Sequence, residues 1–199
     1  RYVALEGDYA VIGASRNDNA NGIDAGAVYI FENSSGSWTE KAKLMADDGA
    51  EADLLGYSVA IDGDYLVAGA PWTDDSGTES GAAYVFKREG SSWIQQAKLN
   101  ASDGGVDNRF GITVDISGEY VIVGAFFDDD FGTRSGSAYI YKRTGTTWTE
   151  QAILHASDGA EGDWFGVSVS IQDDFAAVGS RYDDNENGMP SVTIVTVVY

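Results

Sequence analysis

The side chains most able to do chemistry in this sequence lie in four acidic loops. Each loop follows a short apolar run and combines carboxylate or amide side chains with a glycine. Calcium takes about six to eight oxygen ligands, and a glycine permits the sharp turn that wraps a loop around it. Asn or Asp alternates with other residues at 17–24 and 183–188, whereas the loops at 73–80 and 128–135 break this alternation. We therefore predict calcium ligands among Asn17, Asn19, Asn21, Asp24, Asp74, Asp128, Asp130, Asp183, Asn185 and Asn187.

Paired carboxylates could also act as acid and base in glycoside hydrolysis. A catalytic pair should occur once, however, whereas these acids recur at the same place in every loop. His155 is the single histidine of a chain without cysteine, so a zinc site is excluded and we expect a surface residue there. Ser76 and Ser135 lack the sequence context of a nucleophile elbow. We predict no catalytic residue and no enzyme activity.

The net charge excludes further classes of function. Twelve Lys and Arg residues stand against 32 Asp and Glu residues, which gives a formal net charge of -20 at pH 7. Such a field repels nucleic acid and anionic lipid, and it attracts cations. No apolar run approaches the roughly 20 residues of a transmembrane helix. We expect no nucleic-acid partner and no direct membrane insertion.

The loops belong to a repeat with a period close to 55 residues. Three sets of residues recur at this spacing: Trp38, Trp93 and Trp148; Gly56, Gly111 and Gly166; and Tyr29, Tyr84 and Tyr139. Each repeat contains strand-like runs, which the second repeat has at 57–62, 65–70, 82–88 and 92–99. No apolar pattern of helical period persists in the sequence. A period of this length with four strands predicts the blade of a β-propeller.

We predict an all-β fold of about four blades, each a four-stranded antiparallel sheet, with about fifteen strands in total. The approximate blade boundaries are 1–44, 45–99, 100–154 and 155–199, and the last blade is incomplete. The fourth repeat lacks a Trp-bearing outer run, and no such run lies upstream of Arg1. We therefore expect an arc of a larger propeller from a longer protein, with a closed four-bladed ring as the alternative.

Residues that occur in every repeat are expected to serve the blade rather than a ligand. We predict that the three repeated tryptophans pack between neighbouring sheets. The repeated tyrosines are expected in the core, with the hydroxyl reaching a partner. The glycines of the recurring Gly-Ala pairs should permit a close approach of backbones around the axis.

Two short motifs recur with the same period. Copies of the first are RFG (109–111), WFG (164–166) and a weakened LLG (54–56), and copies of the second are GAP (69–71), GAF (124–126), GAS (13–15) and a degraded GS (179–180). The repeats thereby resemble FG-GAP repeats, the blades of the integrin α-subunit propeller. In integrin-type blades the loop after GAP carries alternating Asp or Asn, then Gly and a final Asp, which implies calcium at 17–24 and 183–188. Asp24 stands one place earlier than in that pattern, and Pro190 takes the place of its counterpart.

The resemblance implies an extracellular or cell-surface module for binding or adhesion, supported by calcium and acting on a protein or glycan through loops on one face. A lectin-like carbohydrate binder is one alternative, and its candidate aromatic residues are Trp72, Phe126, Phe127 and Tyr182. A structural repeat of a surface filament, or an accessory domain of a larger enzyme, is the other. The uncharged stretch at 191–199 also predicts self-association through an open edge strand at the C-terminal end.

Overall fold

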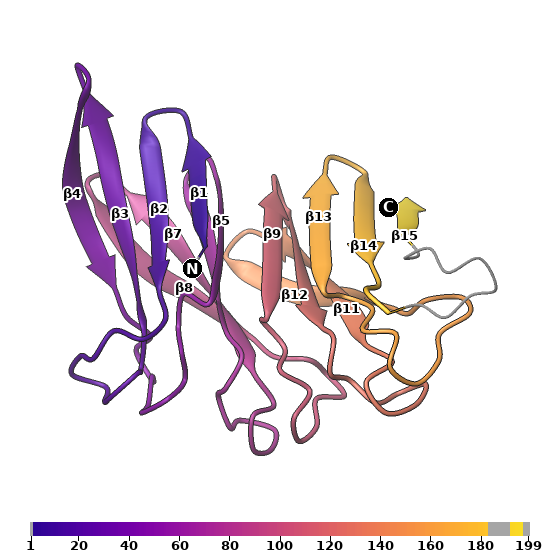
Figure 1. The fold of residues 1–199 in the computed structure, drawn as a ribbon. Helices are drawn as coiled ribbons and strands as arrows, with labels where there is room; N and C mark the ends of the chain where they lie inside the picture. Colours follow the sequence, from indigo (N-terminus) through magenta and orange to yellow (C-terminus); the bar gives the residue numbers. More distant parts are fainter. Residues whose placement is uncertain (1, 183–191, 197–199) are drawn as a thin grey trace.

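The computed structural model describes residues 2–182 and 192–196, which form fifteen strands (Figure 1). The first two sheets contain β1 (Val3–Glu6), β2 (Tyr9–Ala14), β3 (Ala27–Ser34), β4 (Ser37–Leu44), β5 (Ser58–Asp62), β6 (Tyr65–Ala70), β7 (Ala82–Glu89) and β8 (Ser92–Leu99). The third and fourth contain β9 (Thr113–Ser117), β10 (Tyr120–Ala125), β11 (Ser137–Thr144), β12 (Thr147–Leu154), β13 (Ser168–Gln172), β14 (Phe175–Gly179) and β15 (Val192–Thr196). In the described ranges no helix is long and apolar enough to cross a membrane.

The strands form separate antiparallel sheets in the order of the chain. Three sheets have four strands, β1–β4, β5–β8 and β9–β12, and the fourth has β13, β14 and β15. The first strands of successive sheets contact one another, and the sheets fan out from this line as an open arc (Figure 1). The all-β fold and the arc of blades are as predicted from the sequence.

The hydrophobic core lies between neighbouring sheets, in three packed spaces that we call seams. The first seam contains Val11, Val28, Ile30 and Leu44 from one sheet and Val59, Ala68, Tyr84 and Phe86 from the next. The second and third seams repeat this arrangement. Tyr84 and Tyr139 are fully buried, and the Tyr139 hydroxyl donates a hydrogen bond of 2.9 Å to Asp103. Tyr84 and Tyr139 confirm the core position predicted for the repeated tyrosines, whereas Tyr29 in the first sheet is only half-buried.

The repeated tryptophans differ between the ends of the arc. The Trp93 ring packs edge-on against Tyr9 of the preceding sheet, with ring centroids 6.5 Å apart. Trp148 packs in the same way against Tyr65, at 6.1 Å. Trp38 is 48% exposed, because no described sheet precedes the first one. The prediction of packing between sheets is confirmed for Trp93 and Trp148, whereas Trp38 lies at the open end of the described arc, where no neighbouring sheet tests it.

The Gly-Ala pairs bring the backbones of neighbouring sheets into contact. A Cβ atom on Gly69 would overlap the carbonyl oxygen of Gly111 in the next sheet. Gly124 approaches the carbonyl oxygen of Gly166 in the same way. A side chain at either position would therefore push two sheets apart. The close approach predicted for these glycines is confirmed.

Candidate functional site

The asparagines of the first acidic loop brace the loop with their side chains. Asn19 Nδ2 donates to the Gly26 carbonyl at 2.8 Å, and Asn19 Oδ1 accepts from the Asn21 backbone N–H at 2.8 Å. Asn21 Nδ2 donates to the Ala46 carbonyl at 2.7 Å, which ties this loop to the segment that enters the second sheet. Two of the predicted calcium ligands thus hold backbone groups of the loop and of its neighbour.

The other two predicted ligands of this loop lie in different environments. Asn17 Nδ2 donates to the Tyr29 hydroxyl at 3.3 Å, whereas Asn17 Oδ1 is buried without a hydrogen-bond partner. The Asp24 carboxylate lies 3.6 Å from Arg16 at the surface. A buried acceptor without a donor is costly, so Asn17 Oδ1 is the atom of this loop best suited to a cation.

The predicted ligands of the second and fourth loops can be placed only in part. Asp74 Oδ1 accepts from the Glu79 backbone N–H at 2.8 Å, and its carbonyl accepts from the Gly77 N–H at 3.3 Å. These bonds close the loop on itself. Asp183, Asn185 and Asn187 lie outside the described residues.

The third loop contains a fully buried carboxylate, Asp128. Its Oδ1 accepts from the Asp130 N–H at 3.1 Å and the Ser137 hydroxyl at 2.9 Å. Its Oδ2 accepts from Asn108 Nδ2 at 2.5 Å and the Tyr139 hydroxyl at 3.4 Å. Burial, the largest influence, raises the pKa of Asp128 above its ordinary value, although the hydrogen bonds from Asp130 and Ser137 act in the opposite direction. The carboxylate is thus occupied in holding the loop to the sheet.

His155 lies beside this loop and is not a bare surface residue. Its Nδ1 lies 3.1 Å from the Ser137 hydroxyl, and its ring centroid lies 4.6 Å from that of Phe131. Its Nε2 lies 3.9 Å from the Asp130 carboxylate. His155 is thus half-buried against the loop rather than the surface residue expected from the sequence.

The described loops fit a metal ion poorly. Among the described residues, no group of three or more His, Asp or Glu is arranged to hold one. The Asn and Asp side chains of the first and third loops use their oxygens and amides mainly for hydrogen bonds within the protein. Calcium binding stays a prediction, with Asn17 Oδ1 as its best support.

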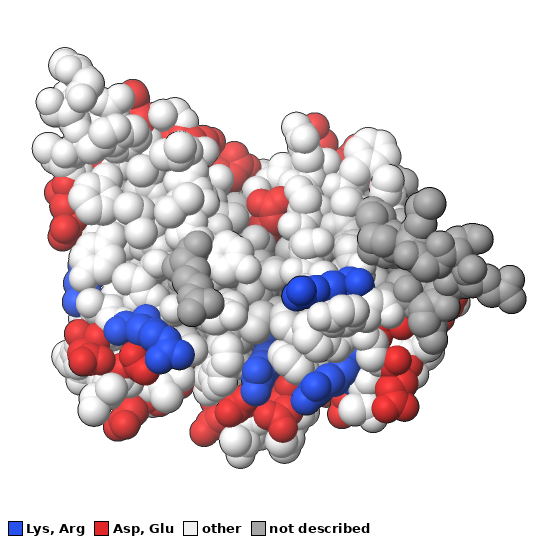
Figure 2. All heavy atoms as spheres, in the orientation of Figure 1, with Lys and Arg blue, Asp and Glu red and all other residues white. Residues whose placement is uncertain are grey.

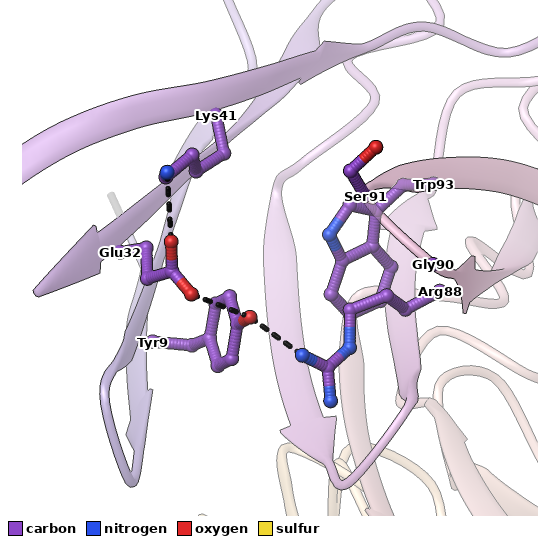
Figure 3. Close-up of a pocket in the computed structure, with 7 residues that line it drawn as sticks. All are labelled: Tyr9, Glu32, Lys41, Arg88, Gly90, Ser91 and Trp93. Atoms are coloured by element: carbon purple, nitrogen blue, oxygen red, sulfur yellow. Dashed lines mark hydrogen bonds and ion pairs between the residues drawn. The ribbon is translucent and has the colours of Figure 1, made fainter.

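A pocket of about 250 Å³ opens at the edge of the first seam (Figure 3). Lys41 pairs with Glu32 at 2.8 Å, the Tyr9 hydroxyl donates to Glu32 at 2.9 Å, and Arg88 donates to that hydroxyl. The hydrogen bond with Lys41 lowers the pKa of Glu32. Trp93 closes the side of the pocket.

The next seam shows that this arrangement belongs to the scaffold. There the guanidinium carbon of Arg143 lies 4.4 Å from the ring centroid of Tyr65, as that of Arg88 lies 4.6 Å from Tyr9. Trp148 takes the place of Trp93. A contact that recurs in successive blades is explained by packing between them, so we assign no ligand to this pocket.

A chain of aromatic rings and arginines runs from the second to the fourth sheet beside the acidic loops. We call it the aromatic–arginine ladder, and it consists of Tyr57, Trp72, Arg109, Phe126, Phe127, Arg134, Trp164, Arg181 and Tyr182. The rings of Tyr57 and Trp72 have centroids 5.2 Å apart. The guanidinium of Arg109 lies 4.9 Å from the centroid of Trp72 and 4.5 Å from that of Phe127. Arg109 thus links the aromatic groups of two blades.

The ladder continues into the fourth repeat. Phe126 stacks on Trp164 with centroids 5.1 Å apart and an interplanar angle of 24°. Trp164 meets Tyr182 edge-on at 4.7 Å, and Arg181 lies 5.2 Å from the Tyr182 centroid. Tyr182 is 52% exposed, and the Phe126 and Trp164 side chains are half-buried. The rings therefore form a continuous surface that solvent can reach.

A small polar pocket of about 200 Å³ opens onto the ladder. Its lining residues are Asp107, Arg109, Phe127, Asp129, Thr133 and Arg134. Arg109 pairs with Glu79 at 2.6 Å, and the Arg134 guanidinium lies 4.9 Å from the Phe127 centroid. In Figure 2 the basic side chains of the visible face lie in its lower half, next to the acidic side chains of the loops. Hydrogen-bond donors and acceptors therefore flank a half-buried aromatic ring, Phe127, in this pocket.

The residue types at the ladder positions differ between repeats, although the backbone conformation at these positions is the same. Leu54, Arg109 and Trp164 are equivalent, and all three have a left-handed backbone, with φ of 59°, 55° and 58°. Similarly, the second residue after the Gly-Ala or Gly-Ser pair is Arg16, Trp72, Phe127 and Tyr182 in the four repeats. The scaffold therefore holds these positions in the same place while their chemistry changes.

The sequence indicated part of the ladder and missed the rest. All four aromatic candidates of the lectin-like alternative, Trp72, Phe126, Phe127 and Tyr182, lie in it. Tyr57, Trp164 and the three arginines were not predicted. Arg109 and Trp164 belong to the FG motifs, and no local pattern shows that these motifs lie against the loops after the Gly-Ala pairs. A comparison of equivalent positions could have found them, since Leu54 gives way to Arg109 and Trp164 in a repeated backbone.

Comparison with known proteins agrees with the repeat. No curated protein matches the sequence. The family model of the FG-GAP repeat matches at residues 1–31, 38–86, 93–141 and 148–193, which together make up most of the chain. The last three matches begin 55 residues apart, which is the period of the repeat. Each of these three begins on the last strand of one sheet and ends on the third strand of the next. The chain therefore belongs to the FG-GAP repeat family.

Proposed function

We propose that this chain is a ligand-binding module of an extracellular protein and that the aromatic–arginine ladder binds carbohydrate. The observation that carries the proposal is the convergence of variable positions from three repeats into one surface of aromatic rings, which Arg109 connects between the second and third repeats. The packing residues of this scaffold repeat while these positions vary, which favours a role in binding for the ladder over a role in the fold.

The chemistry of the ladder suits a sugar. A flat aromatic ring packs well against the apolar C–H face of a pyranose, and half-buried Phe127 offers such a ring inside the small pocket. Arg134 and Asp129 beside it can donate and accept hydrogen bonds with sugar hydroxyls. Sites of this kind combine apolar contact with a few placed polar groups.

The net charge favours an uncharged glycan over a polyanion. A chain of formal charge -20 repels sulfated or phosphorylated polymers at long range, even where a few arginines are exposed. We infer that the ladder recognises neutral oligosaccharides and returns them unchanged, as a binding module does.

A glycan array followed by titration calorimetry tests this function. The chain is expected to bind a subset of neutral oligosaccharides, and Trp164→Ala is expected to weaken that binding by about tenfold or more, about 1.4 kcal/mol. Trp38→Ala is the matched control, because Trp38 is an exposed tryptophan outside the ladder. An array with no binding above background, or equal affinity for both variants, would contradict the proposal.

Calcium-supported adhesion is a second candidate function. It is favoured by the strongly negative charge and by the buried, unpartnered Asn17 Oδ1. Here the ion would stiffen the loops that border the ladder rather than bind the ligand itself. The response of stability to calcium, given in the Discussion, tests this candidate.

A further inference from the structure

The first acidic loop contains an asparagine followed by a glycine, Asn21 and Gly22. Asparagine is a thermolabile residue, and a following glycine has no side chain to hinder attack of its backbone nitrogen on the asparagine amide. Asn19 in the same loop precedes an alanine. Among the residues that the structure describes, Asn21 is the asparagine that precedes a glycine, since a second Asn-Gly pair at 187–188 lies outside them.

The reaction open to this pair is deamidation, which needs water and no enzyme. Base removes the proton of the Gly22 backbone N–H, and the nitrogen attacks Cγ of Asn21. Ammonia leaves, and the new bond closes a cyclic imide in the backbone. Water then opens the imide at one of its two carbonyl carbons, which gives aspartate or isoaspartate at this position.

The folded loop holds both reacting groups by separate hydrogen bonds. Asn21 Nδ2 donates to the Ala46 carbonyl at 2.7 Å, and the Gly22 N–H donates to the Asn19 carbonyl at 3.2 Å. A Cβ on Gly22 would lie 2.8 Å from the Cα of Glu51, so the pair packs closely on the segment that enters the second sheet. The attack therefore requires a local opening of the loop in which both hydrogen bonds break.

The products cannot restore the contact that Asn21 makes. A carboxylate has no N–H to donate to the Ala46 carbonyl, and its charge repels that oxygen. Gly49 closes the space beside the amide, because a Cβ on Gly49 would lie 2.5 Å from Asn21 Nδ2. Isoaspartate also lengthens the backbone of a loop that is packed on its neighbour. Both products therefore favour the open loop.

The contact that Asn21 reinforces joins the loop to the next sheet (Figure 1). The backbone N–H groups of Ala52, Leu54 and Leu55 donate to carbonyls of residues 23–25 at 2.9, 3.2 and 3.0 Å. The next seam has the same backbone bonds, between residues 107–110 and 78–80. The first loop adds the side-chain bond of Asn21 to this repeated backbone contact.

We propose that Asn21 is a site of spontaneous deamidation and that its modification releases the first acidic loop from the second sheet. Opening of the loop limits the reaction, so the folded chain reacts more slowly than the unfolded chain. Because the products disfavour closing, the released form accumulates as the protein ages. Asn21 lies outside the aromatic–arginine ladder, so this inference does not depend on glycan binding.

Peptide mass spectrometry of the full chain, incubated at mildly alkaline pH, tests the reaction. The folded chain is expected to accumulate aspartate and isoaspartate at Asn21, about tenfold or more slowly than the chain unfolded in urea. Asn19 should keep its amide, and peptide mapping separates Asn21 from Asn187. A folded chain with no conversion at Asn21, or with the same rate as the unfolded chain, would overturn the proposal.

Hydrogen exchange of Asn21→Asp, which carries one of the products, tests the release. The experiment is done in EDTA, so that calcium binding does not enter. The amides at 52–55 that bond to the loop are expected to exchange about tenfold or more faster than in the wild type. The equivalent amides at 107–110 should be unchanged.

Asn33→Asp is the matched control for the added charge. Asn33 Oδ1 accepts from the Gly36 N–H at 3.0 Å, and a carboxylate can accept the same bond. Exchange at 52–55 should therefore stay at the wild-type rate in this variant. Wild-type exchange in Asn21→Asp would overturn the release, and so would faster exchange at 52–55 and 107–110 alike, because the loss would then be global.

Discussion

Trp148 and Trp164 lie sixteen positions apart in the sequence and illustrate two different regions of the molecule. Trp148 belongs to a seam, where the same residue type meets the same partner in successive blades. Trp164 belongs to the aromatic–arginine ladder, where its counterparts are Leu54 and Arg109. In this chain, repetition marks the residues that hold the blades together. Variation at a repeated backbone position marks the residues for which we propose a ligand.

The largest expected loss of stability comes from a substitution that forces apart the two backbones that meet in a seam. Gly124→Ala places a methyl group against the Gly166 carbonyl oxygen of the next sheet, and neither backbone can move freely. We expect a loss of about 3 kcal/mol in the free energy of unfolding, at the upper end for overpacking. Denaturant unfolding measures it. Gly105→Ala is the control, because a Cβ there meets its nearest neighbour at an ordinary 3.4 Å; equal losses in both variants would contradict this account of the seam.

A somewhat smaller effect is expected from a tryptophan of the seam. Trp93→Ala removes a half-buried ring that packs on Tyr9, and it should cost about 2–3 kcal/mol, below the range for fully buried aromatics. Trp38→Ala should cost less than about 1 kcal/mol for a dilute monomer, since no described sheet covers it. Denaturant unfolding should show a larger loss of stability for Trp93→Ala than for Trp38→Ala. Equal losses would contradict the role of Trp93 in the seam.

The sequence predicted the seams better than the ladder, for a physical reason. Strand positions and packing residues follow from a local pattern that repeats, so the fifteen strands and the role of Trp93 could be predicted. The contact of Arg109 with Trp72 depends on how one sheet is oriented against the next, which no local pattern contains. The exposure of Trp38 likewise depends on whether a neighbour is present. A single repeat has the same sequence whether or not another sheet packs against it.

A moderate effect is expected at the buried carboxylate of the third loop. Asp128→Asn keeps the size of the side chain but cannot accept all four of its hydrogen bonds. We expect a loss of about 1–3 kcal/mol at neutral pH. Denaturant unfolding measures it, with Asp129→Asn as the control, because Asp129 is exposed in the same loop.

The pH dependence of the Asp128→Asn variant sharpens this prediction. Burial raises the pKa of Asp128 in the folded state, so the folded state binds its proton at higher pH than the unfolded state does. The penalty for a buried charge is therefore present at neutral pH and is relieved as pH falls toward the ordinary carboxyl pKa of 3.8. The stability gap between wild type and variant should widen over that interval. A gap that narrows would mean that the charged form is the one the site favours.

The smallest expected effect concerns calcium in the acidic loops. A cation bound to the folded state alone raises stability by mass action, about 2.7 kcal/mol at a hundredfold excess over its dissociation constant. Because the described loops mostly satisfy their own polar groups, we expect a rise in melting temperature well below that limit. Asn17→Ala should abolish the rise, and Asp62→Ala, in a hairpin, should leave it. Identical melting curves in calcium and in EDTA would show that the acidic loops are solvated turns.

The central claim is that seams carry stability and the ladder carries binding. The most direct test measures both quantities, by denaturant unfolding and glycan titration, in Trp93→Ala and Trp164→Ala. The account predicts that Trp93→Ala loses about 2–3 kcal/mol of stability while its folded fraction keeps its affinity. Trp164→Ala should lose about tenfold or more in affinity and at most about 1 kcal/mol of stability. Two variants that lose stability and affinity in the same proportion would contradict the claim, because the two regions would then be a single structural unit.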